Sequence, residues 1–341
     1  MPLRAIQEGK TINAYNLNQK KWEELKESRK KSKLQMPCCK NSAIPKTSKL
    51  GTQFFAHGRR GECTPTSESK EHLLAKTIIA RICQIEGWDV TTEYSGETPN
   101  KEKWIADVYA KKGKVQIVFE VQWSSQTIEI TRKRQERYKA LGIRSAWLAK
   151  KKKREYFNEI EEYQLPYFHI EYNEKENNFN VPRYKVTLQA FIQGMLNKKL
   201  RWFPEKGMNV ESGLITIDVN CWRCKRDIQV IVGIEVKSKV NKFKKFYYFD
   251  EVSDTIISMI TPSLQQKHKI GIIKKRYSKT MQHQYLSNGC YYCDAIYGNF
   301  FLKEEILELL VVDSILYPIK IEVHKLGKEI PLPNQVWHFE K

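Results

Sequence analysis

The segment that most constrains the fold of this 341-residue chain runs from Trp104 to Gln122. It reads WIADVYAKKGKVQIVFEVQ, two apolar runs joined by a Lys-Gly turn, which is typical of two antiparallel strands. Each run carries a carboxylate among apolar residues, Asp107 in the first and Glu120 in the second. A buried carboxylate is costly unless something pairs with it. The two carboxylates on neighbouring strands therefore predict a divalent-cation site.

The residues around this segment predict an α-β-β-β-α-β order. A helix begins after the N-cap Ser69 and stops at Gly87, and a second helix closes at Gly142. The predicted ranges are helix 69–87, strands 88–94, 103–111 and 114–122, helix 127–141 and strand 143–150. We therefore expect an α+β fold in which a mixed sheet carries helices on its faces.

The charge of the chain points to a polyanion as its partner. Lys and Arg total 59 and Asp and Glu total 39, which gives a net charge of +20. This surplus favours nucleic acid, and the alternative is a basic protein without such a ligand. No apolar run reaches about 18 residues and no apolar signal core is found, so we expect a cytoplasmic protein with no membrane partner.

The two strand carboxylates have the arrangement that phosphodiester hydrolysis needs. Carboxylates hold Mg²⁺, and a polar group must lie near the attacking water. Antiparallel pairing would bring Asp107 and Glu120 together. Gln122 is two residues after Glu120, so it points from the same face of the strand toward the same site.

The preceding helix adds further polar groups to the predicted site. Glu71 shares a helix face with Leu74, so we expect it to point inward and reach the metal or a water. Glu68, one turn before His72, is the alternative to Glu71. Lys76 lies one turn after His72 on the flank.

The motifs in this region resemble the competence protein CoiA family, which belongs to the PD-(D/E)XK, restriction-endonuclease-like nucleases. The matching motifs are ES-x-EH-x-x-x-K at 68–76, IADV at 105–108, FEVQWS at 119–124, R-x-x-x-Y at 134–138 and AWLA at 146–149. The resemblance covers roughly residues 1–150 and implies a restriction-endonuclease-like αβββαβ core.

The resemblance also implies roles for individual residues. Asp107, Glu120 and Glu71 would be the Mg²⁺ or Mn²⁺ ligands. Gln122 takes the place usually held by the motif lysine, and we hypothesise that Lys76 supplies the missing charge. Ala106 replaces the motif proline, a change that is common in this superfamily.

The implied function is a Mg²⁺-dependent DNA endonuclease or DNA-processing factor that handles incoming or recombining DNA. One alternative is a catalytically inactive DNA-binding accessory protein of recombination. The other is a nuclease of anti-phage or mobile-element defence, which shares the chemistry and differs in context. The implied partners are DNA, single- or double-stranded, and recombination or defence proteins.

Cysteines indicate metal binding elsewhere in the chain. The pairs Cys221-x-x-Cys224 and Cys290-x-x-Cys293 have the spacing of a structural Zn²⁺ site, and an insert of basic and aromatic residues separates them. A second Zn²⁺ site is possible near the N-terminus, where its candidate ligands are Cys38, Cys39, His57 and Cys63. His57 is alternatively a structural or DNA-facing residue, and Cys83 is expected in the core of its helix.

Basic residues with interleaved aromatics suggest nucleic-acid contacts, because cations meet phosphates and rings stack on bases. The alternative is an amphipathic strand with solvated lysines. Arg134 either contacts the DNA backbone or braces the site. The other candidates, all in the insert, are Lys244, Lys245, Lys274, Lys275 and Arg276.

These patterns predict four parts of the chain. Residues 1–66 would form a small N-terminal module with strands at 3–7 and 11–15, a basic helix at 18–33 and a loop-like stretch from 36. Residues 67–152 would form the nuclease-like core, 153–210 a linker or extension, and 211–341 a zinc-ribbon domain with the basic insert.

Overall fold

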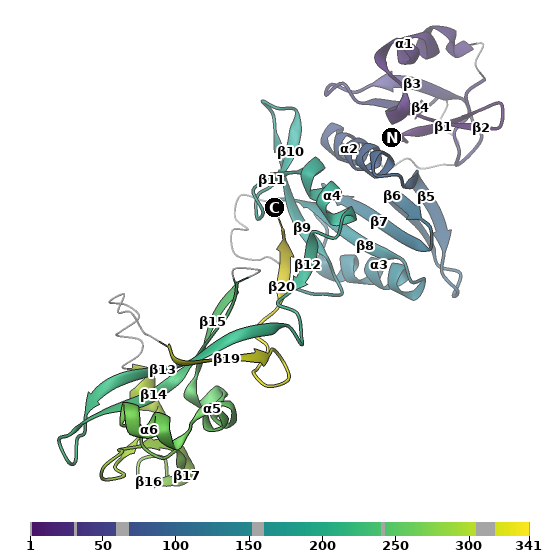
Figure 1. The fold of residues 1–341 in the computed structure, drawn as a ribbon. Helices are drawn as coiled ribbons and strands as arrows, with labels where there is room; N and C mark the ends of the chain where they lie inside the picture. Colours follow the sequence, from purple (N-terminus) through teal and green to yellow (C-terminus); the bar gives the residue numbers. More distant parts are fainter. Residues whose placement is uncertain are drawn as a thin grey trace. The chain divides into compact units, whose positions relative to one another are not determined.

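The protein divides into two units in the computed structural model (Figure 1). The first comprises Met1–Trp202 and Val336–Lys341, and the second comprises Phe203–Gln335. The structure describes residues 2–30, 33–58, 68–151, 160–239, 243–304 and 318–340. Both units combine helices with sheets, so the predicted α+β class is confirmed.

The N-terminal part of the first unit forms two small hairpins beside a helix. Its elements are β1 (Arg4–Gln7), β2 (Lys10–Asn13), η1 (Ala14–Asn16), α1 (Gln19–Glu27), η2 (Ser28–Lys30), β3 (Ala43–Thr47) and β4 (Gln53–His57). The loop-like interpretation of the stretch from residue 36 was wrong where the β3–β4 hairpin forms. Phe55 drives this pairing, since it is fully buried and packs edge-on against Trp22 at 5.2 Å between ring centroids.

A seven-stranded mixed sheet forms the centre of the first unit. Its order is β11 (Val186–Thr187), β10 (Asn178–Val181), β9 (Tyr167–Asn173), β8 (Arg144–Lys150), β7 (Val115–Gln122), β6 (Lys103–Lys112) and β5 (Asp89–Glu97). Strands β5, β6 and β7 pair antiparallel, whereas β7, β8 and β9 run parallel. The segment predicted to be a linker or extension adds three strands to this sheet where it is described.

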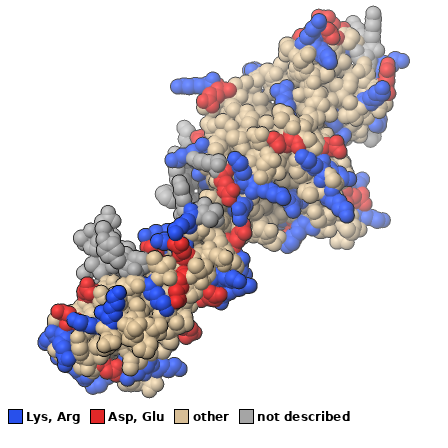
Figure 2. Space-filling model, in the orientation of Figure 1, with Lys and Arg blue, Asp and Glu red and all other residues tan. Residues whose placement is uncertain are grey.

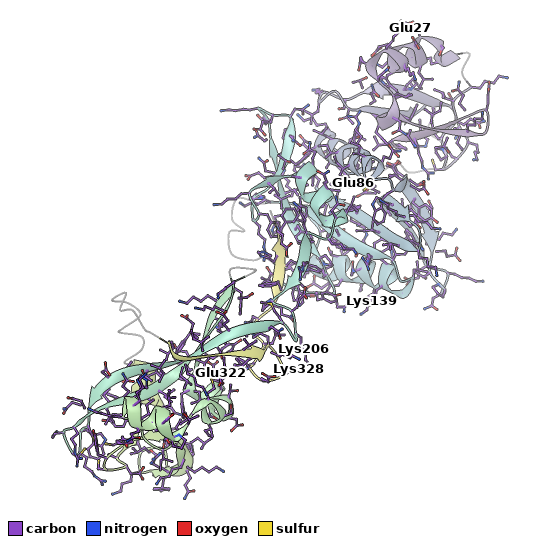
Figure 3. The ribbon with its side chains drawn as sticks, viewed as in Figure 1. Glu27, Glu86, Lys139, Lys206, Glu322 and Lys328 are labelled. Atoms are coloured by element: carbon purple, nitrogen blue, oxygen red, sulfur yellow. The ribbon has the colours of Figure 1, made fainter. Side chains whose placement is uncertain are left out.

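Helices cover both faces of this sheet. Alternate residues of β7 point to opposite faces, and Phe119 packs with α2 (Lys70–Ile85) and α4 (Leu188–Leu196). Val118 faces the other way, toward α3 (Ile128–Ala140). Figure 3 labels Glu86 at the C-terminal end of α2, where its carboxylate accepts hydrogen bonds from Gln193 and Asn197, at the C-terminal end of α4. The two helices on that face are thereby joined.

The buried face of α2 differs from the expected one. Leu74, Ile78 and Ile82, the face expected to be buried, are half-buried. The fully enclosed stripe includes Leu73, Lys76, Ile79 and Cys83. The core position expected for Cys83 is confirmed. As a result Lys76, rather than Leu74, points toward the sheet.

The second unit contains two antiparallel sheets with short helices between them. One sheet has the order β15 (Phe243–Tyr248), β14 (Asp227–Ser238), β13 (Asn209–Asn220) and β19 (Pro318–Lys325). The other has the order β16 (Lys274–Ser278), β17 (His283–Gly289) and β18 (Ile296–Tyr297). The helices are η3 (Phe249–Glu251), α5 (Ser253–Met259) and α6 (Pro262–His268). A further pair, β12 (Leu200–Phe203) with β20 (Val336–Phe339), belongs to the first unit except for Phe203.

Lys and Arg side chains are distributed over both units on the face shown in Figure 2, with Asp and Glu side chains among them. Within the described ranges, no helix combines the length and apolarity that crossing a membrane requires.

A tight cross-strand contact offers a test of the sheet. Gly96 in β5 pairs with Trp104 in β6, and a Cβ atom at Gly96 would lie 2.1 Å from the Trp104 ring. We predict that Gly96→Ala lowers the free energy of unfolding by about 1–3 kcal/mol, because the buried ring must shift. Urea titration measures this change, and Ser95→Ala at the neighbouring exposed position is the matched control. Equal stability of the two variants would contradict the packing.

Candidate functional site

Asp107 in β6 is the centre of a polar cluster between α2 and the sheet. Its Oδ2 atom accepts a hydrogen bond from the Val121 N–H at 2.9 Å and lies 3.1 Å from Nε2 of His72. The Oδ1 atom lies 3.8 Å from Nζ of Lys76. Burial opposes ionisation, but His72 and Lys76 outweigh it and hold the pKa of Asp107 well below its usual range. Asp107 is therefore a carboxylate that is ready to bind a cation.

Lys76 is a fully buried cation surrounded by carboxylates. Its side chain is 0% exposed, and its Nζ atom lies 2.8 Å from Oε1 of Glu68 and 2.6 Å from Oε1 of Glu93. Burial favours the neutral amine, but Glu93, Glu68 and Asp107 outweigh that effect and raise the pKa of Lys76. The lysine therefore stays charged, and its charge lowers the pKa of Glu68 against the effect of burial.

Glu93 connects this cluster to the N-terminal strand. It lies between Thr92 and Tyr94, whose partners in β6, Val108 and Ala106, flank Asp107, and it adopts a left-handed backbone conformation with φ of 47°. Its carboxylate accepts the Leu3 N–H at 3.3 Å, and Arg4 donates to its backbone carbonyl at 3.0 Å. No sequence pattern marked Glu93 as a site residue, since its role depends on segments about 90 residues apart in the chain.

Glu120 has different surroundings from Asp107. It is 1% exposed, with Oε2 accepting from Arg134 at 2.7 Å and Oε1 accepting from the Tyr138 hydroxyl. Burial and the nearby Asp107 raise the pKa of Glu120 to about 8, although Arg134 and Tyr138 oppose that rise. Arg134 also lies over the Trp147 ring, 4.9 Å from its centroid. The sequence left two roles open for Arg134, contact with the DNA backbone or bracing of the site. Its contacts with Glu120 and Trp147 correspond to bracing.

The structure brings together some of the predicted site residues and not others. Ligand atoms of Glu68, His72 and Asp107 lie within 4.8 Å of one another. Glu71 is outside that group, and its carboxylate lies 3.6 Å from Lys70. Successive helix residues differ by about 100° in direction, so Glu71 cannot share the face of its neighbour His72. Glu68, His72 and Lys76 are each four residues apart, which places them on one side of a helix. This spacing is the sequence signal that could have identified the residues facing Asp107.

Gln122 lines a cavity of about 600 Å³. Its side-chain amide donates to the Ser124 carbonyl at 2.7 Å. The cavity opens where β7 and β8 end, and Lys150, Arg132 and His169 contribute to its lining. A cavity lined by cationic groups suits a phosphate-bearing ligand.

Residues 68–204 match the family model of the competence protein CoiA nuclease-like domain. This segment is similar to the CoiA nuclease-like domain. It contains the α2 stripe, both strand carboxylates, α3 and the strands that extend the sheet. A search of curated proteins found no match to the chain. The CoiA-type domain suggests a nuclease or DNA-processing role.

Outside the CoiA-type domain, the four cysteines of the two C-x-x-C pairs form one cluster. Sγ of Cys221 lies 3.7 Å from that of Cys293, and Sγ of Cys224 lies 3.7 Å from that of Cys290. Four sulfurs at about 2.3 Å from a tetrahedral zinc ion would be about 3.8 Å apart. The cluster could therefore hold zinc, and four protein ligands leave no open position for catalysis.

Each C-x-x-C pair lies in a tight turn, the knuckle, at residues 221–226 and 290–295, and the two knuckles have matching backbones. The Cys221 N–H donates to the Arg226 carbonyl at 2.9 Å, and the Cys290 N–H donates to the Ala295 carbonyl at 2.8 Å. The residue after the second cysteine is left-handed in both, with φ of 60° at Lys225 and 57° at Asp294. Each turn thus directs both of its thiols toward the other knuckle.

The N-terminal candidates are partly brought together. Cys38, Cys39 and His57 form a group of possible ligands, with Sγ of Cys38 3.3 Å from Nε2 of His57. Cys63 lies outside the described residues.

The basic candidates of the second unit differ in accessibility. Lys244 pairs with Glu235 at 2.5 Å, and Lys274 pairs with Asp294 at 2.7 Å. Arg276 is 9% exposed and donates to the Ser287 carbonyl at 2.6 Å and to Asp294. Lys245 and Lys275 are exposed. Arg276 therefore has little surface with which to contact a phosphate.

The buried lysine gives a stability prediction. We predict that Lys76→Met lowers the free energy of unfolding by about 3–5 kcal/mol, because it leaves buried carboxylates without their counter-charge. The control Lys70→Met removes a half-exposed cation of the same helix and should change stability by about 1 kcal/mol or less. Urea titration compares both with wild type.

Adding Glu93→Gln to the Lys76→Met variant should restore part of the loss, because one uncompensated carboxylate is removed. A Lys76→Met protein as stable as wild type would contradict the assigned charge network.

The cysteine cluster gives a metal prediction. We predict that Cys224→Ala lowers the zinc content of the purified protein by about one ion per chain, since a tetrahedral site loses one of its thiolates. Elemental analysis measures this content. Cys83→Ala is the control because Cys83 is a core thiol that belongs to none of the ligand groups found in the described ranges. Unchanged zinc in Cys224→Ala would exclude the site.

Proposed function

We propose that the chain is a metal-dependent DNA nuclease of the CoiA-like type, with a restriction-endonuclease-like PD-(D/E)XK core in its first unit. The observation that carries this proposal is the convergence of Glu68, which precedes α2, and His72 of α2 on Asp107 of β6. Glu120 lies on the adjacent strand β7, close enough for the Asp107 carboxylate to raise the pKa of Glu120. Ionised carboxylates gathered this way are the usual means of holding a catalytic cation.

The donor set fits a divalent cation. Asp107 and Glu68 are held ionised, and His72 adds a nitrogen ligand, so the mixed set suits Mn²⁺ as well as Mg²⁺. When bound, such a cation polarises the scissile phosphate and lowers the pKa of water. Glu120 retains a proton more readily than Asp107 does, and Arg134 holds its carboxyl group in place.

Lys76 acts in this proposal as a positioning residue. Its ammonium group is fully enclosed, so it fixes Glu68 and Asp107 rather than contacting the phosphate. Gln122 orients the attacking water, since its amide lies at the end of the strand that carries Glu120. The cavity beside Gln122 receives the DNA backbone through Lys150 and Arg132.

Two observations favour the alternative of an inactive DNA-binding protein. The ammonium group of Lys76 pairs with Glu68 and Asp107, the same carboxylates that a cation would need. Gln122 in place of the motif lysine also removes a positive charge from the site. In that case the domain would bind DNA as an accessory of recombination without cutting it. A role in recombination or in defence would follow from its partners, whose identity is also a proposal.

Cleavage assays test the proposal. Linear, circular and single-stranded DNA are incubated with Mg²⁺ or Mn²⁺ and with wild type, Asp107→Asn or Glu120→Gln. We predict that each substitution lowers the cleavage rate about 100-fold or more, because each removes a charge or proton-transfer group from the site. Asp89→Asn, an exposed carboxylate of the same sheet, should keep wild-type activity.

Calorimetric titration with Mn²⁺ separates the two functions without measuring turnover. The nuclease proposal requires Mn²⁺ binding that Asp107→Asn weakens and Asp89→Asn does not. If no substrate is cut, Mn²⁺ does not bind and all variants still bind DNA equally, the non-catalytic function is the correct one.

A further inference from the structure

The tips of the two cysteine knuckles carry exposed aromatic rings that the cysteine cluster does not use. Trp222 is 55% exposed, Tyr291 is 40% exposed and Tyr292 is 37% exposed. All three lie between the cysteines of their C-x-x-C pairs, and none belongs to the hydrophobic core around the thiols. Exposing large rings is unfavourable, so their presence at the tips indicates a ligand.

These rings are held in fixed positions. The Trp222 Nε1–H donates to the Ile296 carbonyl at 3.2 Å, which ties the tip of the first knuckle to the strand after the second. Tyr291 and Tyr292 pack edge-on, with centroids 5.1 Å apart. The guanidinium carbon of Arg226, in the first knuckle, lies 4.3 Å from the ring centroid of Tyr292, in the second. The ring faces are therefore ordered before any ligand binds, which lowers the entropic cost of binding.

Uncompensated cations surround the rings. Among the described residues, Arg223, Lys225 and Arg226 have no ion-pair partner. In β16, by contrast, Lys274 and Arg276 both pair with Asp294. Arg223 lies over the Trp222 ring at 5.6 Å. The nearby carboxylate of Asp227 accepts a hydrogen bond from Asn220 instead. The knuckle tips thus combine positive charge with exposed ring faces.

We propose that this surface, formed by Trp222, Arg223, Lys225, Arg226, Tyr291 and Tyr292, binds single-stranded nucleic acid. Unpaired bases stack on the rings, and the cations contact the phosphates. A duplex does not fit as well, because its base faces are already stacked within the helix. The proposal shares with the proposed function only the assumption of a nucleic-acid ligand, and it holds whether or not the first unit cuts DNA.

Fluorescence anisotropy with the full-length protein tests the surface. The probes are a labelled oligothymidine and a labelled duplex, both without divalent cations so that cleavage does not interfere. Trp222→Ala and the double variant Tyr291→Ala/Tyr292→Ala should each weaken binding of the single strand about tenfold and that of the duplex much less. Ile321→Ala, which truncates an exposed apolar side chain of β19, should bind like wild type.

Zinc content is measured for each variant in parallel. If Trp222→Ala loses zinc, the pair Trp222→Phe and Trp222→Leu decides, because phenylalanine keeps a ring face and leucine keeps only apolar volume. Weaker binding by Trp222→Leu than by Trp222→Phe, at equal zinc content, supports stacking. Unchanged affinity in all ring variants, or equal losses for single strand and duplex, would overturn the proposal. Neither result depends on cleavage activity.

Discussion

The buried ammonium group of Lys76 is the interaction on which the rest of the site depends. Taking a charge out of water costs several kcal/mol, so such a group persists only when opposite charges surround it. Glu68, Glu93 and Asp107 supply those charges from the segment just before α2, from β5 and from β6. Because Glu93 also accepts the Leu3 N–H, the N-terminal strand is joined to the same network. One lysine thereby ties the small N-terminal hairpins to the sheet and to the candidate metal ligands.

The two strand carboxylates occupy different electrostatic environments although they are on adjacent strands. Asp107 meets Lys76 and His72 on the side of α2, which favours its ionised form. Glu120 is more deeply buried and lies near the Asp107 carboxylate, which together favour its protonated form although Arg134 and Tyr138 of α3 oppose it. Pairs of acids whose pKa values are shifted in opposite directions are typical of sites that both hold charge and transfer protons. The difference arises because His72 and Lys76 of α2 stabilise the charge of Asp107, whereas burial and the Asp107 carboxylate outweigh the cation beside Glu120.

Local patterns in the sequence predicted the helices and strands of the core to within a few residues. The range 103–111 became β6 at Lys103–Lys112, and 127–141 became α3 at Ile128–Ala140. The C-x-x-C spacing likewise predicted the cysteine cluster. The helix face was harder to assign, because α2 has apolar residues on more than one side and the pattern around Leu74 was as regular as the one that is buried. For the same reason Glu71 was preferred over Glu68.

Residue type and spacing thus determined which elements form, which residues can ionise and which cysteines pair as knuckles, because these depend on neighbours a few positions away. Long-range contacts settled the rest. The position of Glu93 beside Lys76, the three strands that β9, β10 and β11 add to the sheet and the enclosure of Arg276 all involve distant segments. A buried charge must find its partner wherever the folded chain places one, and no local pattern carries that information.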